Sequence, residues 1–572
     1  MSALPSPTYP NDDVEAPFLP NSNPRISAEE DEAILGVREV HVIPEIDTGE
    51  VTEGYSWAKL WKYTGPGWLI FSPFTFPTLR SIAYLDPGNL ESDLQAGAVA
   101  GYSLLWLLLW AHITGLAMQI LAARLGVVTG KHLAQLIHAR YPPLLSYLIW
   151  AFTELAIIGS DIQEIVGTAI ALKIIFALPL WIGVLLTAGD TFTFMLLQQY
   201  GVRKLEAFFM VLIGTMAVCF WVEMFESKPD FGKVLEGIIV PNVPERAVVQ
   251  AVAMLGAVIM PHNMYLHSNL IISSPPPSPR SPTATSALVM SRNLGPSPPV
   301  SKLREANFYF AIESGLALFI SYLINLALVV CFAQVYFSPD LPDDTPLPGL
   351  YDAAEVLTRV LGPAAKYLWA AGLFAAGQSS TMTGTLAGQY VIEGFFGAIF
   401  KKQWHRVAIT RAIALVPSML VAVLAVERFD TMGELLNVLQ SICLPTALIP
   451  ILKLSASTAV MSVNFRISTV GAAACWVLAA ITTGFNVYLF LSFLEELPAK
   501  WIGIIVGMMY LLFLAYLVYV PVREEEGSDG WRILEEGAEG EEEGEEREVN
   551  EREAERDGLV GRDEAVVDTT RE

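Results

Sequence analysis

Long apolar blocks recur along most of this 572-residue chain, and they constrain its fold more than any other feature. A helix needs roughly 20 apolar residues to cross the hydrocarbon core of a bilayer, and the blocks are about that long. Hydrophobic residues make up 53% of the sequence and charged residues only 16%, whereas soluble domains carry roughly 25% charged residues. The sequence therefore predicts an all-α polytopic membrane protein in a lipid bilayer.

Twelve apolar segments are predicted, and together they make residues 56–520 a single transmembrane domain. The connections alternate between basic and neutral or acidic, and the positive-inside rule places the basic set in the cytoplasm. Both termini are then expected to be cytoplasmic, as an even number of segments requires. The membrane, plasma or endosomal/vacuolar, is left open. The segments are 66–89, 101–124, 145–173, 179–199, 203–225, 246–271, 308–337, 364–396, 406–426, 432–453, 467–494 and 499–520.

The net charge of −24 is located entirely in the two tails. Residues 1–55 carry 12 acidic and 2 basic side chains, and residues 521–572 carry 21 acidic and 7 basic ones. Residues 56–520 are therefore neutral overall. Both tails are predicted to be acidic and disordered, because they hold too little apolar surface to fold alone. Their charge gives no information about a bound ion.

Two of the predicted segments are interrupted at their centre by proline and polar residues. The first contains Asp86-Pro87-Gly88-Asn89, and the sixth contains Met260-Pro261-His262-Asn263. Proline removes a helical hydrogen bond, and at membrane depth such a break is tolerated only where the freed backbone faces a cavity or a ligand. The first and sixth segments are corresponding positions of two five-segment halves, which indicates inverted repeats around a midplane site. Two kinks that only shape the bundle are the alternative interpretation.

The side chains at the two breaks indicate a transition metal. Asp86 and Asn89 offer hard oxygen ligands, which alone would suit magnesium or calcium. The thioether of Met260 is a soft ligand, and it adds affinity for manganese, iron, cobalt or cadmium.

These two motifs resemble those of the natural resistance-associated macrophage protein (Nramp) family of proton-coupled divalent metal transporters. The stretches 376–381, 410–411 and 436–441 match as well, and the similarity runs from about Gly65 to Leu454. The resemblance implies a LeuT-type fold, with segments 1–5 and 6–10 as inverted repeats plus two further helices. It implies proton-coupled transport of manganese, iron or similar ions towards the cytoplasm. It assigns metal binding to Asp86, Asn89, Met260 and the Ala257 carbonyl, with the Ala83 carbonyl and Asn437 as further contacts.

A proton route is expected beside the metal site. Glu154, Asp161 and Glu164 share one face of the third segment, and ionisable groups inside a membrane usually face the bundle interior or water. The resemblance makes Asp161 and Glu164 parts of the route; a buried network that only locks helices together is the alternative. Further members are expected to be Asp86, His262, His267, Arg411 and, nearer the cytoplasmic end, Arg406.

Two stretches depart from the family pattern. About ten residues, Phe71 to Arg80, lengthen the first half-helix, and a Pro/Ser-rich stretch, Asn269 to Ser286, follows His267. Such composition is typical of linkers. Genuine loops on the aqueous side and translated intron sequence are both compatible with it.

Other function classes are less well supported. A sodium-coupled amino-acid or amine symporter of the same fold and a non-transporting metal sensor remain alternatives. No phosphate loop, nucleophile elbow or zinc-hydrolase spacing is present, so no enzyme is expected. The four cysteines lie in apolar segments without CxxC spacing. No resident cofactor is expected, because the metal ion is substrate, and no basic patch indicates nucleic acid.

Overall fold

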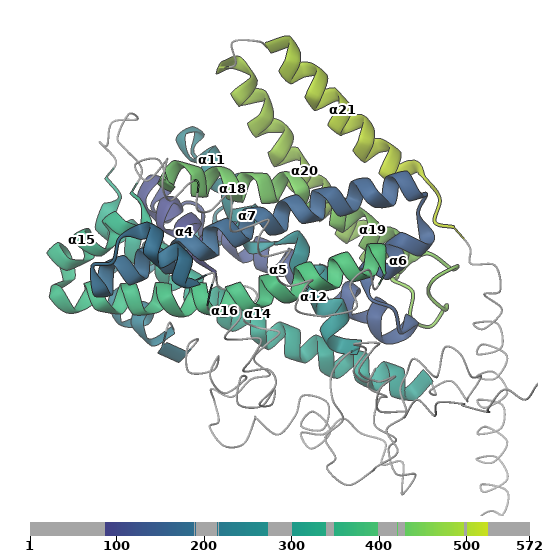
Figure 1. Ribbon diagram of the computed structural model, residues 1–572, viewed down its shortest axis with the longest axis horizontal. Coiled ribbons are helices and arrows are strands. Elements are labelled where there is room, and N and C mark those ends of the chain that lie inside the picture. The colour runs from purple at the N-terminus through teal and green to yellow at the C-terminus, as the bar shows by residue number, and fades with distance from the viewer. Residues whose placement is uncertain are drawn as a thin grey trace, which may run out of the picture. The chain divides into compact units, whose positions relative to one another are not determined.

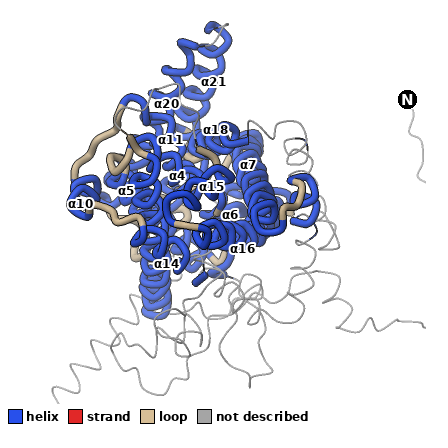
Figure 2. The backbone as a smooth tube through the Cα atoms, turned by 90° about the vertical axis from the view of Figure 1, so that its left-hand side faces the viewer, coloured by secondary structure: helices blue, strands red, loops and turns tan. Residues whose placement is uncertain are grey.

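The computed structural model describes residues 86–187, 217–272, 300–338, 348–397, 429–496 and 500–523, together with residues 189, 214, 215 and 420. Within these ranges every regular element is a helix, and Figure 2 shows no strand among them. The predicted all-α class is confirmed. Several predicted segments lie largely outside the described residues. They are 406–426 apart from residue 420, much of 179–199 and 203–225, and nearly all of both acidic tails.

Figure 1 shows how the helices are arranged. In chain order they are α4 (Pro87–Ala100), α5 (Leu105–Thr129), α6 (Leu133–Arg140), α7 (Pro143–Phe176), α10 (Phe231–Ile239), the 3-10 turn η3 (Glu245–Ala247), α11 (Val248–Val258), α12 (Pro261–Ile272), α14 (Val300–Tyr336), α15 (Leu350–Leu361), α16 (Pro363–Phe396), α18 (Phe429–Cys443), α19 (Pro445–Ala456), α20 (Thr469–Glu496) and α21 (Lys500–Tyr519).

Seven spans among the described residues are long and apolar enough to cross a membrane. They overlap the predicted segments 2, 3, 6, 7, 10, 11 and 12, and α16 coincides with the predicted segment 8. The total of twelve segments stays a prediction. The helix α12 continues to Ile272, so the first four residues of the stretch that departs from the family pattern are helical. Residues 273–286 and the whole of 71–80 lie outside the described part of the chain.

The first predicted segment ends too early. It was placed at 66–89, but α4 begins at Pro87 and runs to Ala100. The prediction missed this half-helix because Glu91, Asp93 and Gln95 make it polar. All three side chains are nevertheless buried. Hydropathy cannot detect a helix that the rest of the protein shields from lipid on every side.

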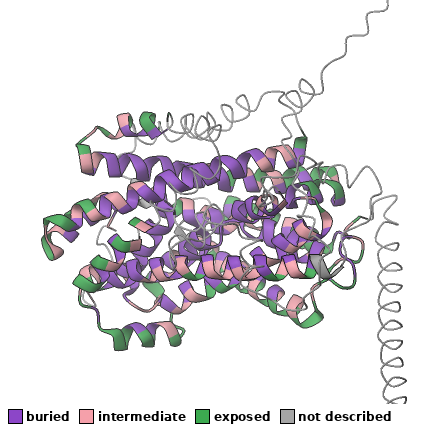
Figure 3. Cartoon of the chain, turned by 90° about the horizontal axis from the view of Figure 1, so that it is seen from below, coloured by how far each residue is buried: buried purple, intermediate pink, exposed green. Residues whose placement is uncertain are grey.

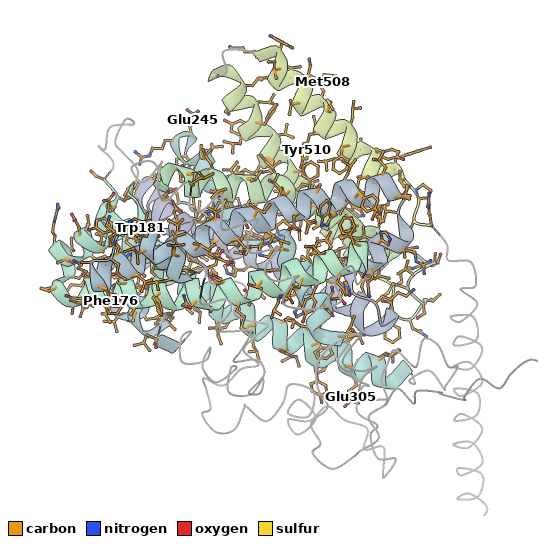
Figure 4. All side chains as sticks on the ribbon, viewed as in Figure 1. Phe176, Trp181, Glu245, Glu305, Met508 and Tyr510 are labelled. Carbon is orange, nitrogen blue, oxygen red and sulfur yellow. The ribbon has the colours of Figure 1, made fainter. Side chains whose placement is uncertain are left out.

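The last helix shows where lipid meets the protein. Only three residues of α21 are buried, Gly503, Leu514 and Leu517. Its other faces expose isoleucine, valine, leucine and methionine, including Met508, labelled in Figure 4. A soluble protein rarely exposes so large an apolar surface, whereas a helix whose backbone is satisfied internally is stable in hydrocarbon. This surface therefore identifies α21 as lipid-facing.

The half-helices α4 and α11 pack against each other in the interior of the bundle. Around them, α14 covers α4, α18 covers α11, and the long helices α7 and α16 pack side by side. Figure 3 shows the buried residues running along these central helices. The start of α4 and the end of α11 are thus enclosed by protein.

Candidate metal site

The sixth segment is broken where the sequence predicts. The helix α11 ends at Val258 and α12 begins at Pro261, with Ile259 and Met260 between them. Pro261 has no N–H, so the carbonyl of Ala257, four residues earlier, has no helical donor. Ala257 is fully buried and Met260 is 1% exposed. The break therefore brings one carbonyl oxygen that lacks its helical donor and one thioether to the same turn.

The sulfur of Met260 is oriented by a neighbour. The side-chain amide of Asn263 donates to Met260 Sδ at 3.3 Å, and Asn263 is itself 2% exposed. A long, flexible methionine side chain is thereby restrained at the break. The asparagine of the Met-Pro-His-Asn motif thus orients a predicted ligand and is not itself a predicted ligand.

Asp86 lies at the start of the half-helix α4, where the sequence predicts the break in the first segment. It is the N-cap of α4, with an extended backbone, and its Oδ1 accepts a hydrogen bond from the Asn89 N–H at 2.7 Å. Pro87 follows at the first helical position, where its missing N–H costs nothing. The second carboxylate oxygen, Oδ2, is buried and has no hydrogen-bond partner among the described residues. A buried carboxylate oxygen needs a cation, a proton or a water to be stable.

Asn89 lies one turn into α4 and is fully buried. Ala83, the other predicted backbone contact, lies outside the described residues. In the sequence it precedes Pro87 by four positions, which is also the spacing of Ala257 and Pro261. The same missing donor is therefore expected at both breaks.

The two breaks meet at Asn437 of α18. The Asn437 amide donates to the Gly88 carbonyl at 3.0 Å, next to Asp86. A Cβ placed on Gly256 would collide with the Asn437 carbonyl oxygen, so α11 touches the same residue beside Ala257. One residue thus contacts both half-helices. In this conformation its side chain is hydrogen-bonded to protein, and its role as a metal ligand stays a prediction.

Gln163 of α7 is a residue that the sequence analysis did not single out. Its Nε2 donates to Asn437 Oδ1 at 2.9 Å and to the Gly433 carbonyl at 2.8 Å, and its Oε1 accepts from Gln440 at 2.9 Å. These bonds tie α7 to α18 beside the metal site. The sequence feature that could have indicated Gln163 was its position at mid-segment between Asp161 and Glu164, two predicted members of the proton route.

The third-segment carboxylates lie on the buried side of α7. Asp161 is 4% exposed and Glu164 is 1% exposed, and Ser160 donates to Glu164 Oε1 at 3.1 Å. A Cβ on Gly384 of α16 would lie 2.8 Å from Asp161 Oδ1 and 3.2 Å from both Glu164 carboxylate oxygens. The two carboxylates therefore share one small space against α16. Glu154 is only partly buried, and Arg406 and Arg411 lie outside the described residues.

The two histidines of α12 have different environments. His262 directly follows Pro261 and is 2% exposed. His267 lies farther along, where its Nδ1 is 3.0 Å from Gln119 Nε2 and its Nε2 is 3.3 Å from Ser314 Oγ. Both ring nitrogens of His267 are thus engaged by α5 and α14. His267 therefore connects α12 to α5 and α14, whichever ring nitrogen carries the proton.

Comparison with known proteins decides the family. The family model described as natural resistance-associated macrophage protein-like matches residues 78–492. The chain belongs to the Nramp family. It is 44% identical to the Dictyostelium discoideum protein named metal transporter nramp1 homolog, over 84% of each chain. It is also 44% identical to natural resistance-associated macrophage protein 2 of Mus musculus, over 84% of this chain and 82% of that protein.

A solved structure shows the same fold. The manganese transporter of Eremococcus coleocola, in complex with an aromatic bis-isothiourea substituted compound, superposes with a TM-score of 0.65. The match has 26% sequence identity and covers 84% of this chain and 98% of that one. The Nramp fold expected from the sequence motifs is confirmed.

Proposed function

We propose that this Nramp protein transports divalent transition-metal ions across its membrane, towards the cytoplasm and coupled to protons. One observation supports the metal assignment: both half-helices contact Asn437, α4 next to the buried carboxylate oxygen of Asp86 and α11 just before the break that holds Met260. The metal transporters named among its relatives support the same function.

The ligand chemistry favours manganese, iron, cobalt or cadmium. The Asp86 carboxylate supplies negative charge and a hard oxygen, and the Asn89 amide and the Ala257 carbonyl supply further hard but uncharged oxygens. The Met260 sulfur supplies soft character that magnesium and calcium do not use. An amino-acid substrate fits poorly, because its carboxylate would be repelled by Asp86.

Proton coupling is proposed on the paired carboxylates of α7. Asp161 and Glu164 are both buried, and their carboxylates share one small space against Gly384 of α16. Two carboxylates in one small space favour binding of a proton, because two like charges repel each other. A cation reaching Asp86 would shift the charge balance of the bundle and favour proton release.

Uptake of Mn²⁺ into proteoliposomes, with and without an imposed pH gradient, tests the proposal. Uptake stimulated by an acidic outside and abolished by Asp86→Ala is expected. Asp161→Asn and Glu164→Gln are expected to alter the pH dependence more than the affinity for metal. Amino-acid flux without metal would favour the symporter, and Mn²⁺ binding without flux would favour the sensor. Equal uptake by Asp86→Ala and the parent would refute the site.

A further inference from the structure

The tenth predicted segment contains an interruption that the sequence analysis did not recognise. The helix α18 ends at Cys443 and α19 begins at Pro445, although the backbone at Leu444 remains helical. Because Pro445 has no N–H, the carbonyl of Ser441 loses the donor four residues on and accepts instead from the Leu444 N–H at 3.2 Å. This short stretch, 441–445, is called the segment-10 break below. Freed carbonyls at membrane depth must find other donors.

Two helices at the C-terminal end of the membrane domain add side-chain hydrogen bonds at this break. Asn486 of α20 donates from Nδ2 to the Ser441 carbonyl at 2.7 Å, and its Oδ1 accepts from Ser441 Oγ at 2.7 Å. Tyr510 of α21, labelled in Figure 4, donates its hydroxyl to the Ile442 carbonyl at 2.5 Å. Asn486 is 5% exposed. Three hydrogen bonds from α20 and α21 thus converge on two consecutive residues of the break.

The helix α21 is also joined to the end of α19. Lys453 donates to the carbonyls of Leu517, Val518 and Val520 at the C-terminal end of α21. Its ammonium also lies 5.7 Å from the ring centroid of Tyr141. A cation that bonds the last carbonyls of a helix is stabilised by the helix dipole. The helix α21 is therefore bonded both to the break, at Ile442, and to the end of α19, at Lys453.

The break lies next to the candidate metal site. A Cβ on Gly256 would lie 2.6 Å from the Ser441 backbone nitrogen, so α11 touches the break one residue before Ala257. Asn437, one turn before Ser441, holds the Gly88 carbonyl of α4. A shift of the break would move α18 against both half-helices at once.

We propose that Asn486 and Tyr510 are positioning residues for metal transport, which hold the segment-10 break and so set the distance between Asn437 and the two half-helices. They contact no predicted metal ligand and act through α18. The effect on transport rests on the proposed function. The claim that Asn486 and Tyr510 hold the segment-10 break can be tested without measuring transport.

The natural Cys443 makes the break measurable in the full-length protein. Its thiol is fully buried at the last residue of α18, so N-ethylmaleimide labels it only when the break opens. Labelling rates at Cys443 are read by mass spectrometry, with Cys475 of α20 as an internal reference. The variants are Tyr510→Phe, which removes one hydroxyl, and Asn486→Leu. Tyr516→Phe is the matched control, since Tyr516 lies on the same helix and is 51% exposed.

Loss of one hydrogen bond changes an equilibrium by roughly three- to tenfold. Tyr510→Phe is expected to raise Cys443 labelling by about that factor, with Asn486→Leu higher because two bonds are lost. The KM for Mn²⁺ uptake in proteoliposomes is expected to rise in the same order, while the midpoint of thermal unfolding of Tyr510→Phe stays within the range of Tyr516→Phe.

Labelling and KM of Tyr510→Phe that equal those of Tyr516→Phe would overturn the inference. Faster labelling with an unchanged KM would also overturn it, because the break would then be held without consequence for the site. A parent protein that moves no Mn²⁺ would refute the proposed function instead. In that case raised Cys443 labelling in Tyr510→Phe alone among the tyrosine variants would still support the hold on the break.

Discussion

The side-chain amide of Asn437 donates to the backbone carbonyl of Gly88 at 3.0 Å, across 349 residues of sequence. This bond joins α18 to the first turn of α4, directly beside Asp86. Asn437 also accepts from Gln163 of α7 at 2.9 Å. The first half-helix is therefore held in place by side chains of α18 and α7. Each of these side chains can be removed by a separate substitution.

Asn437→Leu is expected to lower Mn²⁺ uptake by roughly tenfold. The substitution keeps the size of the side chain but removes two buried hydrogen bonds, each contributing about 1 kcal/mol. Initial uptake rates in proteoliposomes at several Mn²⁺ concentrations check this. Asn464→Leu is the control, because Asn464 is exposed. An Asn437→Leu protein with the parent's rate and KM would show that the bond to Gly88 does not position the site.

Met260→Leu is expected to change the selectivity among metal ions more than the rate of transport. The thioether is lost, while the volume stays nearly the same. Soft Cd²⁺ should therefore lose affinity by about tenfold or more relative to Ca²⁺ and Mg²⁺, which prefer oxygen. Competition of each metal against Mn²⁺ uptake measures the order.

Met264→Leu provides the control for that experiment. Met264 lies one turn farther along α12 and is also fully buried, so it reports the packing effect of the same substitution. If both variants changed the metal order equally, Met260 would be a packing residue and the sulfur would have no role as a ligand.

Particular residues show how far the sequence could predict this arrangement. The break at Pro261 was predictable, because proline, histidine and asparagine interrupt an otherwise apolar run. The helix α4 was not, because Glu91 and Asp93 look like a loop until the surrounding helices are known to bury them. The segment-10 break was missed because Pro445 is followed by apolar residues, which conceal it in any hydropathy window.

The contacts among the helices were not predictable at all. The bonds from Asn437 to Gly88 and from Asn486 to Ser441 join residues 349 and 45 positions apart. No local periodicity indicates which buried amide meets which freed carbonyl. The ligand types could be named from the two motifs, whereas the residues that hold them in position required the packing of α7, α18, α20 and α21.

Gly384→Ala is expected to disturb the proposed proton route without changing a charge. The added Cβ would lie 2.8 Å from Asp161 Oδ1 and 3.2 Å from the Glu164 oxygens, closer than such contacts allow, so the carboxylates must move. The pH dependence of Mn²⁺ uptake is expected to shift, while the KM for Mn²⁺ at a fixed acidic pH changes by less than about twofold. Gly315→Ala on α14 is the control, since its Cβ would meet open space. An unchanged pH profile would argue that the two carboxylates only join helices.

His132 predicts a pH dependence of stability that is separate from transport. It lies between the spans α5 and α7, at the start of α6, and burial lowers the pKa of its imidazole from 6.5 to about 4. The unfolded chain therefore binds the proton more readily than the folded one. The contribution of this group to stability is full above pH 6.5 and is lost as the pH falls towards about 4, by roughly 3 kcal/mol at about 1.4 kcal/mol per pKa unit.

Thermal unfolding of the purified protein in detergent, followed from neutral pH to about pH 4, measures this loss. The midpoint of the parent is expected to fall steeply over that interval, and His132→Gln is expected to flatten the fall because a glutamine does not titrate. His138→Gln changes an exposed histidine of the same short helix and should leave the steep fall intact. The imidazole of His132 is buried against Gly394 of α16, and this burial favours its neutral form. Parallel profiles of the parent and of His132→Gln would therefore contradict the prediction and mean that other groups control the acid sensitivity.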